Sequence, residues 1–351
     1  MTYMNAHHPD VGPAPVPVDG PDAPLLRVRG LTVGVSGSDK EIVRGVDLDI
    51  RQGEVLAIVG ESGSGKSVTA LALAQLLPRG LQITGGSVQL DQTEMVGQDE
   101  ATLTALRGTE LSMLFQQPQT MLDPTARVDA QVAEPLWRKE RLRGRGAFGR
   151  VVDLLRGVGI PDPEARARCY SHELSGGMAQ RVMMACAMAG SPRLLIADEP
   201  TTALDVTVQA QILRLLRDTR DRHNLSILLI THDLAVVAAF ADRVAVMYAG
   251  RIVEEGPARQ IMTAPAHPYT RALVRCSLLE PDAHGRLASI GGSSSLALDL
   301  TQGCRFAPRC AAMHQHHGLE HSCCSDEPAM QPVGDGWHSR CHASCQTGGR
   351  A

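Results

Sequence analysis

The sequence predicts an α/β protein built on a mostly parallel sheet with helices on both faces. Short apolar segments at 55–59, 194–197 and 225–233 alternate with helix-like segments along the chain. Buried strands that alternate with amphipathic helices are typical of parallel sheets. Hydrophobic residues make up 43% of the 351 residues, which suffices for a sizeable core and excludes general disorder.

The composition also excludes several classes of protein. Aromatic residues amount to only 3%, which argues against an aromatic platform for single-stranded nucleic acid. The net charge of -4 argues against a dedicated DNA-binding protein. No uninterrupted apolar run is long enough to span a membrane, and the start lacks the charged-then-apolar pattern of a signal peptide. We therefore expect neither a membrane span nor export.

The first half of the predicted domain can be followed element by element. Residues 1–24 are rich in Pro, Gly and Asp, and we expect a disordered tail. Segments 25–35 and 43–50 alternate as strands do, and Val55–Val59 is a short buried strand. A helix is expected to begin near Lys66 and to end at Pro78, because proline cannot continue it.

The second half begins with a change of composition. Residues from about 118 to 173 are mostly helical in composition and predict a helical subdomain. Its basic stretch, 138–150, fits a solvated helix face, with contact to anionic lipid as the alternative. Segment 206–223 is an amphipathic helix, and 233–241 is another. After about 263 the periodicity weakens, so we expect one domain over 25–262 and an extension over 263–351.

The strongest motif joins the strand at 55–59 to the helix that follows it. The spacing G-x-x-x-x-G-K-S is typical of a P-loop, whose glycines turn backbone N–H groups toward phosphate oxygens. The helix N-terminus adds positive potential. The lysine reaches the outer phosphates and the serine hydroxyl can bind Mg²⁺. The predicted ATP-binding residues are Gly60, Glu61, Ser62, Gly63, Ser64, Gly65, Lys66 and Ser67.

A second motif, which consists of two acidic residues, follows the apolar strand at 194–197. Asp198 and Glu199 come directly after it, at the strand end where ligand crevices form in such sheets. Asp198 suits the Mg²⁺ shell together with Ser67. Glu199 suits a general base that polarises the attacking water. An acidic pair alone is a weak signal, and this one gains its meaning from the P-loop upstream.

Between these motifs lies the stretch His172–Arg181, which contains Leu-Ser-Gly-Gly-Met. Here the chain resembles the ATP-binding-cassette family, whose signature is LSGGQ. Other elements of the family appear in order: Gln116 matches the Q-loop glutamine, Thr202–Asp205 matches the D-loop, and His232 matches the switch histidine. The resemblance covers roughly residues 25–345 and implies a cassette with a parallel core, antiparallel edge strands and a helical subdomain.

The resemblance implies a role for each matched residue. Gln116 would help bind Mg²⁺ and His232 would contact the γ-phosphate, so both join Glu199 as catalytic residues. A Ser-Gly-Gly turn that opens a helix is a second anion site. In the family this site faces the γ-phosphate across a dimer interface, so the resemblance implies that the remaining ATP contacts are made there. These implied contacts are Ser175, Gly176, Gly177 and Asp205. One departure is clear: Val35 occupies the place where the family stacks an aromatic residue on adenine.

Three stretches resemble the peptide- and nickel-importer branch of the family. They are QQPQTMLDP at 116–124, ADEPTTALDVTVQAQIL at 197–213 and the segment from Gly250 to Val274. The branch implies an ATPase at the cytoplasmic face of the membrane, working with two permeases and an extracytoplasmic solute-binding protein. The second cassette is expected to be a different chain, and no nucleic-acid partner is expected. Dipeptides or oligopeptides are the expected cargo.

Two alternatives to peptide import stay open. One is import of nickel or a chelated metal, because the ATPase does not contact the cargo. The other, of a different class, is a non-transport cassette protein acting on nucleic acid or ribosomes. That protein would be expected to carry two fused cassettes, coiled-coil inserts or a basic surface, and the sequence has none of these.

Six of the nine cysteines lie close together near the C-terminus, between residues 304 and 345. In a chain without an export signal, this crowding favours metal or redox chemistry over disulfides. The resemblance implies a [4Fe–4S] cluster on Cys304, Cys310, Cys324 and Cys341, with Cys323 competing for the third place. The alternatives are zinc bound by cysteines and the neighbouring histidines, and thiols that are unligated or linked as disulfides. Those histidines are His314, His316, His317 and His321.

Overall fold

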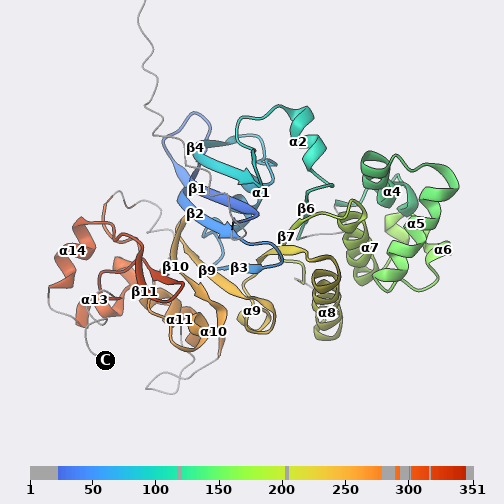
Figure 1. Cartoon of the computed structure of the whole chain (residues 1–351). Coiled ribbons are helices and arrows are strands. Elements are labelled where there is room, and N and C mark those ends of the chain that lie inside the picture. The colour runs from blue at the N-terminus through green and yellow to red at the C-terminus, as the bar shows by residue number, and fades with distance from the viewer. Residues whose placement is uncertain are drawn as a thin grey trace, which may run out of the picture.

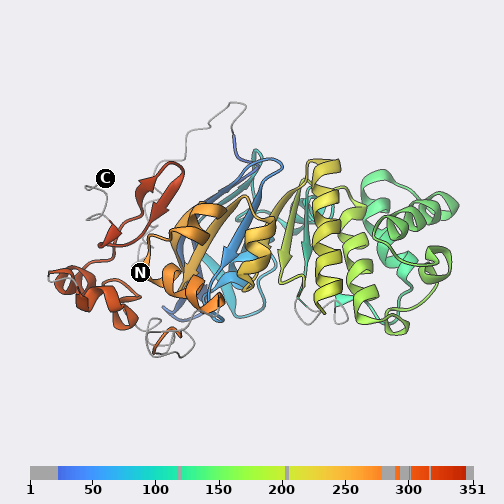
Figure 2. The same cartoon turned by 90° about the horizontal axis from the view of Figure 1, so that it is seen from below.

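The parallel core and the helical lobe lie side by side, with the cysteine-rich extension at the opposite end of the molecule (Figures 1 and 2). The computed structural model describes residues 23–116, 121–201, 205–278, 289–292, 300, 302–315 and 318–344. Within these ranges no helix is both long and apolar enough to cross a membrane.

The centre of the molecule is a sheet of eight strands, of which five are parallel. The parallel strands run in the order β9-β3-β8-β7-β6, as the sequence predicts for an α/β core. Every residue of β3, β7 and β8 is buried, which explains why these segments read as continuous apolar runs. Their bounds are Val55–Val59 (β3), Leu111–Leu114 (β6), Leu194–Asp198 (β7), Ser226–Ile230 (β8) and Arg243–Tyr248 (β9).

A second, antiparallel sheet of four strands has the order β2-β1-β4-β5. Alternation along β1 and β2 places one face of each strand in the core, which confirms the two strands predicted near the N-terminus. The strands of this sheet are Leu26–Val35 (β1), Glu41–Ile50 (β2), Leu81–Leu90 (β4) and Thr93–Glu94 (β5). Two helices lie between β3 and β6 in the chain: α1 (Lys66–Leu73) and α2 (Glu100–Leu106). α1 ends before the predicted stop at Pro78, and Gln75 is already in the left-handed region with φ 56°.

The helical lobe forms one end of the molecule (Figure 1). It comprises α4 (Val128–Glu140), α5 (Gly144–Gly157), α6 (Pro163–Ala167), the 3₁₀ turn η1 (Ser171–Glu173) and α7 (Gly176–Ala189). Buried side chains such as Val132, Leu155 and Val182 join the lobe to the main core cluster. Its basic stretch is solvated: Arg138 pairs with Glu134 at 2.7 Å, and both side chains are exposed.

The segment after β7 supplies the remaining helices and leads into the extension. Its helices are α8 (Val206–His223), α9 (Leu234–Phe240), α10 (Ala258–Thr263), α11 (Pro268–Ser277), η2 (Ala307–Arg309), α13 (Ala311–Gln315) and α14 (Leu319–Ser325). The remaining strands are β10 (Arg251–Pro257), β11 (Gln331–Gly334) and β12 (Trp337–Ser339). β12 pairs with β10, so the extension adds two antiparallel strands to the edge of the central sheet.

Candidate functional site

The loop between β3 and α1 has the tight backbone that the P-loop spacing predicts. Gly60 has φ 153°, and a Cβ atom there would lie 2.1 Å from the carbonyl oxygen of Met247. Only glycine fits at this position, because a side chain would overlap the backbone of the neighbouring strand β9. The loop ends at Gly65, which precedes the first residue of α1, so the backbone N–H groups at the N-terminus of this helix belong to the loop.

Lys66 lies against the backbone of its own loop. Its ammonium donates to the carbonyl oxygens of Gly60 and Glu61, both at 2.9 Å, and the residue is only 6% exposed. Burial lowers the pKa of Lys66, while the carboxylates of Glu199, Asp198 and Glu61 act in the opposite direction. A buried ammonium held by neutral carbonyls is well placed to exchange them for phosphate oxygens.

Ser67 and Asp198 form the next contact, between α1 and the end of β7. The Ser67 hydroxyl donates to Oδ1 of Asp198 at 3.1 Å. Burial raises the pKa of Asp198, whereas the hydrogen bond from Ser67 lowers it. The hydroxyl and carboxylate oxygens are of the type that Mg²⁺ prefers, so the two residues fit the divalent ion that the motifs imply.

The Glu199 carboxylate contacts the two other residues that the sequence assigned to catalysis. The Gln116 side-chain amide donates to its Oε2 at 2.8 Å, and Nδ1 of His232 lies 3.2 Å from its Oε1. The Glu199 side chain is 17% exposed, whereas that of His232 is 63% exposed. The structure therefore brings residues from three separate segments together at the carboxyl edge of the sheet, next to the P-loop.

The signature residues belong to a different part of the molecule. Ser175 caps α7, where its hydroxyl accepts a hydrogen bond from the Met178 amide at 3.3 Å, and Gly176 and Gly177 form the first turn of that helix. Asp205 caps α8 by accepting a bond from the Val208 amide at 2.9 Å. These residues open helices as predicted, whereas their ATP contacts would require a second cassette. The D-loop residues 202–204 and the Q-loop residues 117–120 lie outside the described part of the chain.

Gln180 and two residues of the C-terminal segment contact the site although sequence reasoning assigned them no role. Gln180 is 3% exposed, and its amide donates to the carbonyl oxygen of Pro200 at 2.7 Å. It therefore links the signature helix to the residue after Glu199. The Tyr269 hydroxyl and the Arg309 guanidinium both contact Glu61 of the P-loop. A glutamine after the signature was visible in the sequence, but no spacing signal marks Tyr269 or Arg309.

The predicted cysteine site requires a correction. Cys324 is exposed, whereas Cys323 beside it is buried, because α14 turns Cys323 toward the core. Burial raises the pKa of Cys304 to about 12 and that of Cys323 to about 11, and the charges of Cys310 and Cys341 add to both shifts. Of the five cysteines, Cys310, Cys323 and Cys341 are buried, Cys304 is half-buried and Cys324 is exposed.

The arrangement of these side chains does not fit a metal centre. Across the described ranges, no group of three or more His, Cys, Asp or Glu side chains is placed to hold a metal ion. His321 is exposed, while Cys345 and the side chains of the other three histidines lie outside the described residues. The predicted iron–sulfur and zinc sites are thus unsupported by the structure.

Comparison with known proteins agrees with this geometry. A family model described as "ABC transporter" matches residues 43–202, and one described as "Oligopeptide/dipeptide transporter, C-terminal region" matches residues 253–316. Among solved structures, the ATP-binding cassette MJ0796 bound to ADP and Pi superposes with a TM-score of 0.60 at 28% identity, covering 67% of this chain and 99% of that one. The cbiO1 protein of Clostridium perfringens gives 0.59 at 26% identity, covering 69% and 92%.

Full-length relatives are closer in sequence. The dipeptide transport ATP-binding protein DppD of Escherichia coli is 44% identical over 334 residues, covering 93% of this chain and 98% of its own. The oligopeptide transport ATP-binding protein OppD of Bacillus subtilis is 46% identical over 289 residues, covering 81% of each chain. The chain belongs to the ABC transporter family as an ATP-hydrolysing subunit that carries the C-terminal region of the oligopeptide/dipeptide transporters.

Proposed function

We propose that this chain hydrolyses ATP to drive import of dipeptides or oligopeptides through separate permease subunits. One observation carries the proposal above all: the Glu199 carboxylate contacts both Gln116 and His232 and adjoins the aspartate that binds Ser67. A carboxylate in this position acts as a general base toward a water in line with the β–γ bond. His232 orients that water and the γ-phosphate.

The P-loop residues bind the phosphates of ATP and supply positive charge. Lys66 exchanges its carbonyl partners for the outer phosphates, and the amides of the P-loop hold the remaining oxygens. Ser67, Asp198 and Gln116 would hold Mg²⁺, and the ion, when bound, would supply positive charge that stabilises the transferring phosphoryl group. Ser175, Gly176 and Gly177 complete the site of a second cassette across the dimer, as Asp205 does. We expect that cassette to be a different chain.

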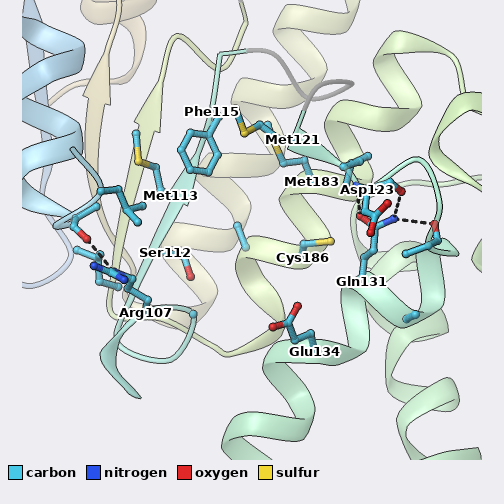
Figure 3. A pocket seen from close by; sticks show the side chains of 18 residues that line it. Arg107, Ser112, Met113, Phe115, Met121, Asp123, Gln131, Glu134, Met183 and Cys186 are labelled. Atoms are coloured by element: carbon cyan, nitrogen blue, oxygen red, sulfur yellow. Dashed lines mark hydrogen bonds between the residues drawn. The ribbon is translucent and has the colours of Figure 1, made fainter. Parts of the chain in front are cut away.

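A groove beside the site suits a permease segment (Figure 3). Its cavity of about 650 Å³ lies between β6 and the helical lobe, and its lining includes Met113 and Phe115 on the sheet side and Gln131 and Glu134 of α4. Leu76 and Met121, which are 37% and 52% exposed, border it. Exposed apolar side chains at a groove are typical of a protein interface. Because Phe115 precedes Gln116, a segment bound here would act directly on the residue that contacts Glu199.

Uptake measurements separate peptide from nickel as cargo. Cells that lack this chain should lose uptake of a radiolabelled dipeptide and keep uptake of radioactive nickel. The wild-type chain should restore peptide uptake, whereas the Glu199→Gln variant should not. The names of the relatives favour peptide. Normal peptide uptake combined with lost nickel uptake would assign the chain to the metal importers instead.

Copurification tests the assembly and its place in the cell. A tag on this chain should recover two permeases and a second cassette from detergent-extracted membranes, as expected for an ATPase bound at the cytoplasmic face. Periplasmic or lipid-anchored solute-binding protein should join them in the presence of peptide. Recovery of ribosomes or nucleic acid, without permeases, would favour the non-transport alternative.

The cysteines have a test of their own. We infer that the buried thiols pack the extension without metal, because their arrangement offers no metal-binding group among the described residues. Protein purified anaerobically should then be colourless and free of iron and acid-labile sulfide. Stoichiometric iron with a visible absorption band would restore the iron–sulfur alternative, with Cys323 replacing Cys324 among its ligands.

A further inference from the structure

The C-terminal segment reaches the P-loop through one buried arginine. Arg309 lies in the turn η2 between Cys304 and Cys310, and its side chain is only 4% exposed. Its Nη1 donates to Oε2 of Glu61 at 2.7 Å and its Nη2 donates to Oε1 at 2.9 Å. A guanidinium that binds both oxygens of one carboxylate is the strongest and most directional form of ion pair.

The position of Arg309 is fixed from several sides. Its Nε donates to the carbonyl oxygen of Gly291 at 2.7 Å, and its Nη1 lies 3.3 Å from the Tyr248 hydroxyl. The guanidinium also lies 5.7 Å from the centre of the Tyr248 ring. Hydrogen bonds with Glu61 and Tyr248 raise the pKa of Arg309, so the residue stays charged.

The backbone of the same loop residue has a second anchor. The amide of Glu61 donates to the Tyr269 hydroxyl of α11 at 2.8 Å. Tyr248, Tyr269 and Phe306 form one aromatic cluster with ring centres 4.6 to 5.4 Å apart. Phe306 belongs to the same loop as Arg309, so this cluster joins the extension to the P-loop through packing as well as charge.

Glu61 needs a counter-charge because of where it stands. It is the only acidic residue of the loop 60–67, which is built to bind an anion. An unpaired carboxylate there would repel phosphate and would attract the ammonium of Lys66 away from it. The guanidinium of Arg309 cancels this charge within the partly buried site.

We propose that Arg309 is a positioning residue of the nucleotide site, which neutralises and orients Glu61 so that the P-loop can bind nucleotide phosphates. The inference rests on the ATP-binding role of this chain and adds a residue from the C-terminal region to that site. Through this ion pair, Arg309 becomes part of the nucleotide-binding machinery although it lies in the C-terminal region.

A charge-removal cycle tests the proposal with the purified full-length chain. MgADP affinity is measured by isothermal titration at low salt for wild type, Arg309→Met, Glu61→Gln and the double variant. Arg309→Met should weaken binding roughly tenfold, equivalent to about 1.4 kcal/mol. Adding Glu61→Gln should restore affinity to within about threefold of wild type, because the uncompensated charge is gone. A merely structural role for Arg309 would not produce this rescue.

Two further variants serve as controls for the effect of Arg309→Met. Arg305→Met removes another arginine of the same loop, whose guanidinium donates to the carbonyl oxygen of Leu300, and this variant should bind MgADP as wild type does. Arg309→Lys keeps the charge and should retain most of the affinity, which covers the case in which Arg309→Met does not fold. Wild-type affinity in a folded Arg309→Met, a double variant as weak as Arg309→Met, or a tenfold weaker Arg309→Lys would overturn the proposal. Wild-type protein that binds no MgADP would contradict the ATP-binding role itself.

Discussion

Glu199 is held in a backbone conformation that a glutamate rarely adopts. Its φ of 48° lies in the left-handed region, which costs a residue with a side chain about 1–3 kcal/mol. Its amide donates to the carbonyl oxygen of Ile230 at 2.8 Å, while Gln116 and His232 bind its carboxylate. These contacts offset the strain and aim the carboxylate at the space beside the P-loop.

Lys66→Ala tests the phosphate-binding role of the lysine. The substitution removes the only ammonium of the loop, so MgATP affinity measured by equilibrium dialysis should fall by about tenfold or more, as for loss of a charged hydrogen bond worth about 1.5–3 kcal/mol. The melting temperature should change little, because the partners of Lys66 are loop carbonyls that can bind water. Unchanged affinity in a folded variant would remove Lys66 from nucleotide binding.

At the scale of single residues, the sequence predicted site residues that belong to contiguous motifs and missed contacts between residues far apart in the chain. The P-loop and the acidic strand end are contiguous motifs whose chemistry follows from their spacing. Gln116 and His232 were assigned through family resemblance, and the structure brings both to Glu199. Arg309 meets Glu61 across 248 positions of the chain, and an arginine in an aperiodic segment carries no local signal of such a partner.

Individual elements depend on close backbone approaches that the sequence does not display. Gly190 ends α7, and a Cβ atom there would lie 1.5 Å from the carbonyl oxygen of Gly108. This contact seats the signature helix against the loop before β6. The helix itself was predicted by its motif, whereas the contact involves two glycines with no periodic pattern.

A pair of glycine substitutions measures this contact. Gly190→Ala should lower the free energy of unfolding by about 1–3 kcal/mol, because a methyl group must displace backbone. Gly149→Ala is the control, since Gly149 lies inside α5 with no atom within 4 Å of the new Cβ, and it should raise stability by about 0.5–1 kcal/mol. Urea unfolding followed by circular dichroism gives both values. Equal effects of the two substitutions would show that the contact contributes nothing.

The burial of the cysteines in the extension predicts the order in which their thiols react. Iodoacetamide should label Cys324 before Cys304 and Cys323 in the native protein at pH 8. Cys324 is exposed, whereas burial raises the pKa of the other two thiols to about 12 and about 11 and so suppresses the reactive thiolate. Peptide mass spectrometry after timed quenching ranks the three sites, and denatured protein provides the control. Earlier labelling of Cys304 would contradict the burial of this thiol group.

At the scale of the whole molecule, the extension joins the central sheet at β10, whereas the helical lobe lies at the other edge, beside β6 (Figure 1). The parallel core was predictable because buried strands alternate with amphipathic helices. The junction of the extension was not, since β12 joins β10 through only two paired positions far apart in sequence. The choice between Cys323 and Cys324 also depended on which face of α14 turns inward, and a helix of seven residues gives little periodic signal.

The residues expected to bind ATP lie in two separate parts of the molecule. Lys66, Ser67 and Glu199 gather at the sheet, whereas Ser175 opens a helix of the other lobe. A second cassette is therefore expected to complete the site, and ATP should bring the two cassettes together. Glu199→Gln should then stabilise the ATP-bound pair of cassettes, because this variant should bind ATP without hydrolysing it at an appreciable rate.

Single-turnover hydrolysis at this chain tests the central claim most directly. The detergent-solubilised assembly is loaded with MgATP, separated quickly from free nucleotide, and its bound ATP and ADP are quantified over time for wild type and Glu199→Gln. We predict that wild type converts its ATP to ADP, while Glu199→Gln retains about one ATP per copy of this chain and hydrolyses it about 100-fold more slowly or worse. Conversion at the wild-type rate by Glu199→Gln would contradict the assignment of Glu199 as the general base.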